Sequence, residues 1–141
     1  MRIMALDVGQ KTVGVAVSDP LGLTGQGLET IRRGQNRELE RLWQLILEYE
    51  VEELLIGLPL RTDGSQGPEA QRVRQFAQRL DQYLKDRDVQ LPISYQDERF
   101  TTAQAEKLLL AADVKRAGRK AVVDKLAAAL ILQSYLDRRS V

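Results

Sequence analysis

Two short apolar runs separated by a polar turn open the chain and constrain its fold more than any other stretch. The first run lies within Arg2–Leu6 and leads into Asp7, and the second run covers Val13–Val17. The intervening Val8-Gly9-Gln10-Lys11 fits a tight turn, because glycine accepts the backbone angles that such turns need. The pattern predicts a β-hairpin that holds one carboxylate, Asp7, at its mouth.

The rest of the chain alternates strand-like and helix-like segments, the latter recognised by apolar residues that recur on one helical face. Three strands joined by short turns indicate an antiparallel meander, whereas strands separated by helices indicate parallel additions. We therefore expect a single domain over residues 1–141, of the α/β class, with a mixed five-stranded sheet and helices on both faces. The expected further elements are a strand at Gly27–Arg32, a helix from Arg37 to about Leu47 with Asn36 as its cap, a strand at Glu53–Leu58, a helix from Pro68 to about Leu84, a strand at Val89–Tyr95, a short helix from Thr101 to about Leu110, a basic loop at Lys115–Lys120 and a last helix from about Lys120 to Asp137.

Composition excludes several kinds of chemistry. The chain has no cysteine and no histidine, so disulfides, cysteine-ligated zinc and Ser-His or Cys-His hydrolysis are excluded. A net charge of +1, from 21 basic and 20 acidic residues, means that any basic surface for nucleic acid must be local.

No apolar run approaches the roughly 20 residues of a membrane span, and no signal core precedes the first strand. We expect a cytoplasmic protein with no membrane partner.

Three acids stand out by position. Asp7 follows the first strand, Glu98 follows the fifth, and Asp124 lies early in the last helix. Carboxyl ends of parallel strands line the crevice where α/β folds place their sites, so these acids can meet there. Three close carboxylates repel one another, and a hard divalent cation such as Mg²⁺ or Mn²⁺ removes that conflict. Two such ions can activate water and stabilise the leaving oxygen of a phosphodiester.

Each acid also has an ordinary structural explanation. Asp7 could be a turn former, Glu98 a surface partner of Arg99, and Asp124 a favourable charge near a helix N-terminus. The same holds for the cations, since a basic set usually forms a solvated surface. That set, however, is adjacent in sequence to Asp124, where a polyanion would have to lie. It consists of Lys115, Arg116, Arg119, Lys120 and Lys125.

Four segments, in order, resemble the YqgF family. They are Asp7 to Asp19 (DVGQKTVGVAVSD), Gly57-Leu58-Pro59-Leu60 with Asp63-Gly64-Ser65, Asp97 to Thr102 (DERFTT), and Val123 to Leu136. This family comprises RNase H-like proteins that are related to RuvC-type Holliday-junction resolvases and assigned to pre-16S ribosomal RNA cleavage. The resemblance covers nearly the whole chain. One departure is that Lys11 is followed by Thr12, where the family commonly has a basic pair.

The resemblance implies an RNase H-like sheet in which Asp7, Glu98 and Asp124 are the catalytic and metal-binding acids, with Mg²⁺ or Mn²⁺, two ions being expected. It implies a metal-dependent nuclease that processes the 5′ end of precursor 16S ribosomal RNA during ribosome biogenesis. The small-subunit precursor is then an expected partner, and the substrate strand would be neutralised by four cations. These substrate-binding candidates are Lys11, Arg61, Arg99 and Lys125.

Other functions stay open. A Holliday-junction resolvase would use the same chemistry on branched DNA and would act as a dimer. A non-catalytic module that binds nucleic acid or the ribosome would keep the fold without turnover. A sugar-kinase or actin-like ATPase would need a second, similar half, and this chain shows no second apolar strand that ends in Asp-x-Gly. A monomer and a homodimer are both compatible with the sequence.

Overall fold

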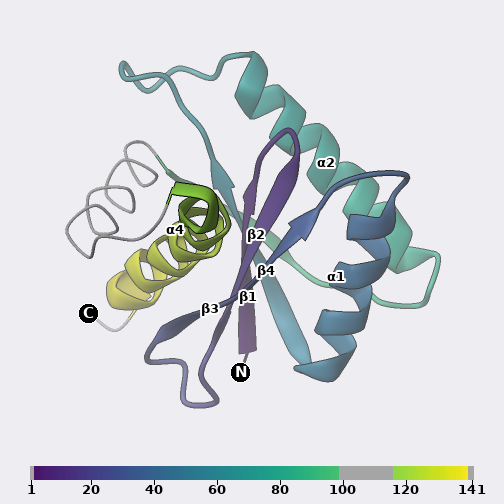
Figure 1. Cartoon of the computed structure of the whole chain (residues 1–141). Helices are drawn as coiled ribbons and strands as arrows, with labels where there is room; N and C mark the ends of the chain where they lie inside the picture. Colours follow the sequence, from purple (N-terminus) through teal and green to yellow (C-terminus); the bar gives the residue numbers. More distant parts are fainter. Residues whose placement is uncertain (1, 99–115, 140–141) are drawn as a thin grey trace.

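The computed structural model describes residues 2–98 and 116–139 (Figure 1). The elements, labelled as in Figure 1, follow the predicted order in the described part of the chain. They are β1 (Arg2–Val8), β2 (Thr12–Ser18), β3 (Gly25–Arg32), α1 (Arg37–Glu48), β4 (Val51–Leu58), α2 (Pro68–Lys85), β5 (Ile93–Asp97) and α4 (Arg116–Arg139).

The strands form one mixed sheet in the order β3-β2-β1-β4-β5. The pairs β1–β2 and β2–β3 are antiparallel, and the pairs β1–β4 and β4–β5 are parallel. This confirms the predicted meander with parallel additions. Because β1, β4 and β5 run in the same direction, their carboxyl ends lie at one edge of the sheet. That edge is where the candidate acids were expected.

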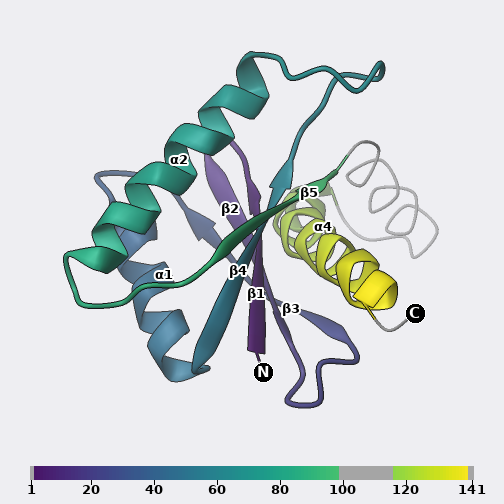
Figure 2. The same ribbon diagram turned by 180° about the vertical axis from the view of Figure 1, so that it is seen from behind.

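Helices cover both faces of the sheet, as predicted. Figures 1 and 2 show α1 and α2 on one face and α4 on the other. Alternate side chains of β1 point to opposite faces, as in any strand. Met4 and Leu6 belong to the cluster that contains Phe76 of α2, whereas Ile3 and Ala5 pack with the α4 face. β1 is therefore a central strand, buried on both sides, and it holds Asp7 rigidly.

β3 and β4 begin at Gly25 and Val51, two residues before their predicted starts, and two other predicted boundaries are further off. The fifth strand begins at Ile93 and extends to Asp97, not from Val89 to Tyr95. Val89 instead donates its N–H to the Leu84 carbonyl at the end of α2, at 2.9 Å, and Pro92 has no N–H for a sheet ladder. Arg116–Lys120, predicted as part of a basic loop, is the start of α4.

The expected cap of α1 is also wrong. Asn36 stands at the cap position, but it has a φ of 62° and its side chain makes no capping hydrogen bond. The buried Glu38 side chain supplies a bond nearby, because its Oε2 accepts the N–H of Gly34 at 3.0 Å. The predicted helix from Thr101 to Leu110 lies outside the described residues. Among the described helices, none combines the length and the apolar character of a membrane span.

Candidate active site

Asp7 and Glu98 meet at the carboxyl edge of the parallel strands. Asp7 follows the pair Leu6–Ile56 in β1, and Glu98 follows β5 and donates its N–H to the Leu58 carbonyl at 3.2 Å. β4 separates the two strands, and its Gly57 leaves the space between them. A Cβ atom on that glycine would lie 2.5 Å from Glu98 Oε2. The glycine therefore lets the two carboxyl groups come together, as the sequence predicted.

The two carboxyl groups share a hydrogen bond, and burial dominates their ionisation. Burial, then the charge of Asp7 and the hydrogen bond to it, raise the pKa of Glu98 to about 10. Burial also raises the pKa of Asp7, the bond from Glu98 opposes that rise, and the charge of Asp124 adds to it. Glu98 therefore carries a proton at neutral pH and donates it to Asp7. Among the described residues, Glu98 Oε2 is buried with no hydrogen-bond partner.

Asp124 reaches this edge because α4 packs closely on β2. A Cβ atom on Gly14 would lie 2.0 Å from the Asp124 carbonyl oxygen, so only glycine permits this approach. Thr12 then fixes the side chain, since its Oγ1 donates to Asp124 Oδ2 at 2.6 Å. Thr12 stands where the family commonly has a second basic residue, and in this chain it orients one of the predicted acids. The sequence held a signal for the approach in Gly14, which interrupts an otherwise apolar strand.

Of the three predicted acids, Asp7 and Glu98 therefore form a hydrogen-bonded pair, and Asp124 lies close enough for its charge to act on Asp7. Within residues 2–98 and 116–139, no group of three or more Asp, Glu, His or Cys side chains is arranged to hold a metal ion. The donor chemistry nevertheless fits a hard divalent cation, because all the donors are carboxylate oxygens. The buried, unpartnered Oε2 of Glu98 and the proton shared with Asp7 both mark a place where positive charge would be stabilising.

Three of the four predicted substrate-binding cations belong to the described residues. Lys11 is exposed in the β1–β2 turn, Arg61 packs over Gly67 in the loop after β4, and Lys125 lies against Gly27 of β3. In the described part of the chain, no ion pair joins these cations to the three acids. Arg99 lies outside the described residues.

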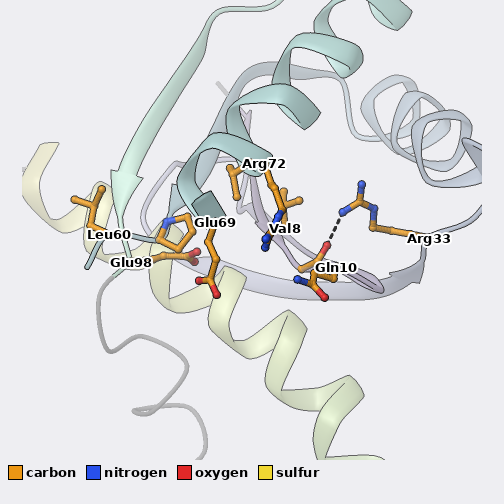
Figure 3. A pocket seen from close by; sticks show the side chains of 10 residues that line it. Val8, Gln10, Arg33, Leu60, Glu69, Arg72 and Glu98 are labelled. Atoms are coloured by element: carbon orange, nitrogen blue, oxygen red, sulfur yellow. Dashed lines mark hydrogen bonds between the residues drawn. The ribbon is translucent and has the colours of Figure 1, made fainter. Parts of the chain in front are cut away.

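A cavity of about 410 Å³ opens beside Glu98 (Figure 3). Two cations that the sequence analysis did not single out, Arg33 and Arg72, line it together with Glu69 and Gln10. Neither cation belongs to a motif: Arg33 follows an edge strand, and Arg72 is one of several arginines on α2. Only the packing of α2 beside the hairpin turn makes them neighbours of the acid pair.

Comparisons with known proteins show which family and which proteins this chain is similar to. A family model described as "RuvX: Holliday junction resolvase" matches residues 1–138. A protein of Heliobacterium modesticaldum named "Putative pre-16S rRNA nuclease" is 50% identical over 141 residues, covering 99% of this chain and 91% of that protein. A protein of Listeria monocytogenes with the same name is 51% identical over 140 residues, covering 97% of this chain and 98% of that protein.

The fold is similar to that of solved resolvases. The structure "T. thermophilus RuvC in complex with Holliday junction substrate" aligns over 99% of this chain and 96% of that chain, with a TM-score of 0.61 and 17% identity. This likeness confirms the RNase H-like fold that the sequence resemblance implied.

Proposed function

This chain belongs to the RuvX family of Holliday junction resolvases and is a nuclease, and on that premise we propose that it trims the 5′ end of precursor 16S ribosomal RNA. The family membership confirms the resemblance to the YqgF family. The 50% identity to a relative named for pre-16S rRNA favours ribosomal RNA over branched DNA as the substrate.

The observation that carries the proposal is the buried carboxyl pair of Asp7 and Glu98 next to Asp124. A nuclease without histidine or cysteine needs another way to activate water. We assign Asp7, Glu98 and Asp124 as the residues that would hold Mg²⁺ or Mn²⁺, two ions being expected. When bound, the metal supplies the positive charge that activates water and stabilises the leaving oxygen of the phosphodiester.

The residues of the chain prepare this site in defined ways. Glu98 would hold a bound cation as a carboxylate, so its proton would have to leave on binding, and both carboxylates would then be available as ligands. Thr12 keeps the carboxylate of Asp124 at the same edge. Lys11, Arg61 and Lys125, with Arg99, would neutralise phosphates of the strand around it.

A second candidate is resolution of Holliday junctions, favoured by the description of the family model. It would require two copies of this chain to present two sites to one junction. The remaining parts of the proposal are a single domain over residues 1–141, a cytoplasmic location and the small-subunit precursor as a partner.

The test is a cleavage assay with Mn²⁺ and with Mg²⁺ on a precursor 16S end, an unstructured RNA and a four-way DNA junction. Each substrate is incubated with wild type, Asp7→Asn and the exposed control Asp86→Asn. We expect wild type and the control to cut the RNA and Asp7→Asn to be inactive. Symmetric, Asp7-dependent nicking of the junction alone would favour the resolvase. Equal cleavage by Asp7→Asn would exclude the proposed site.

A further inference from the structure

The cavity beside Glu98 continues into a second hollow. The first, of about 410 Å³, lies between the β1–β2 turn, the loop after β4 and the start of α2. The second, of about 370 Å³, shares Leu60, Glu69 and Arg72 with it. Each volume falls within the range of pockets that bind small organic ligands, which includes the size of one nucleotide. The two hollows thus form a short track, and Glu98 of the acid pair lines the first of them.

Arg33 is held in place at one end of this track. Its Nη1 donates to the Gly9 carbonyl at 2.5 Å, and its guanidinium lies 5.0 Å from the centroid of the Phe76 ring. An ion pair of 3.9 Å to the buried Glu38 adds a third constraint. A guanidinium has five N–H donors, so these contacts leave donors for a ligand. A fixed guanidinium also loses little freedom when it binds a phosphate.

Arg72 lies where the two hollows join, on the second turn of α2. Its side chain is exposed to solvent, and it lines both hollows. In Figure 3, Arg33 and Glu98 stand on opposite sides of the view, with Arg72 and Glu69 between them. The cavity therefore has a cationic end and an acidic end. Leu60 and Val73 provide apolar surface in its wall.

We infer that this cavity binds one unpaired nucleotide of the substrate strand, adjacent to the phosphate that is cut, with Arg33 and Arg72 on the nucleotide's own phosphate. The inference rests on the proposed nuclease function and specifies its substrate. The apolar wall accepts the base, and Glu69 accepts a hydrogen bond from the sugar or the base. A base in a duplex is stacked and paired, so it would have to be flipped out before it could enter. The site therefore favours single-stranded segments over duplexes.

The experiment measures binding without cleavage. Fluorescence anisotropy in EDTA follows a short, labelled single-stranded RNA and the same RNA as a duplex. The proteins are wild type, Arg72→Gln, the conservative Arg33→Lys, and Arg87→Gln. Arg87 follows the far end of α2 and is exposed, so its replacement removes the same charge away from the cavity. Circular dichroism confirms that each variant is folded.

We expect Arg72→Gln to weaken binding of the single strand about tenfold, as for one lost charge-assisted hydrogen bond. The salt dependence of that binding should also fall by about 0.7 in log–log slope. Arg33→Lys should weaken single-strand binding because lysine lacks the fork of donors. Duplex binding, and binding by Arg87→Gln, should stay unchanged.

The inference is overturned if Arg72→Gln and Arg87→Gln lose affinity equally, if duplex and single strand lose affinity equally, or if wild type does not bind the single strand. These outcomes are independent of the cleavage assay. Cleavage by Asp7→Asn would exclude the catalytic proposal while leaving the binding result in place, and a binding failure with Asp7-dependent cleavage would exclude the cavity alone.

Discussion

Replacing Glu98 by glutamine should stabilise the protein at neutral pH. The pKa of Glu98 rises from 4.5 to about 10 on folding, so the folded state keeps a proton that the unfolded state loses between these values. Stability therefore falls as the pH rises through this window. Between the unfolded-state pKa of 4.5 and pH 7 lie about 2.5 pH units. Over this interval the free energy of unfolding of wild type falls by about 3 kcal/mol. A glutamine amide donates to Asp7 in the same way and has no proton to lose.

Urea unfolding in EDTA measures this effect, with the fluorescence of Trp43, the single tryptophan, as the signal. At pH 7 the midpoint of Glu98→Gln should exceed that of wild type by about 1–2 M urea. At pH 4, below the unfolded-state pKa, the two proteins should unfold together. The control is Glu52→Gln, which changes an exposed carboxylate of β4 and should show no such pH-dependent gain.

Two results would refute the reasoning. An advantage of Glu98→Gln that is equal at pH 4 and pH 7 would show that proton binding is not its cause. A loss of stability at pH 7 would show that the carboxyl group of Glu98 is stabilising where it lies, contrary to its burial beside Asp7. Either result would remove the electrostatic argument for a cation at this edge.

Three further predictions concern the same region. Thr12→Val should lower Mn²⁺ affinity about tenfold in calorimetry because Asp124 loses its hydrogen bond, whereas Thr12→Ser should retain it; equal losses would contradict the role of the hydroxyl. Gly14→Ala should destabilise the fold by about 3 kcal/mol in urea unfolding, because the new methyl group meets α4, while Gly34→Ala has open space and should not. Mn²⁺ should raise the melting temperature of wild type by several degrees and leave that of Asp7→Asn unchanged; equal shifts would place the ion elsewhere.

Local pattern predicted the order of the elements along the chain and both helical layers, because burial imposes a period of 2 on strands and 3.6 on helices. The local pattern gave wrong predictions where another hydrogen bond or another backbone conformation prevailed over the one that the residue types favour. Val89 and Leu91 are apolar enough for a strand. However, the N–H of Val89 is bonded to the Leu84 carbonyl at the end of α2, and Pro92 has no N–H for a sheet ladder, so the strand begins only at Ile93. Asn36 is a good capping residue by type, but its positive φ turns it away from that role. The helix expected from Thr101 and the substrate-binding role of Arg99 stay predictions, because residues 99–115 lie outside the described part of the chain.

The sequence by itself determined the kind of site: a carboxylate at the end of a buried strand, two more acids in related positions, and no histidine or cysteine to offer another chemistry. Only the tertiary structure decided how these parts act together. It paired Asp7 with Glu98 across β4, and it joined Thr12 to Asp124 over 112 residues of chain. The physical reason is that periodicity records which face of an element is buried, whereas the contacts between elements depend on strand pairing and on the close approach that Gly14 and Gly57 allow.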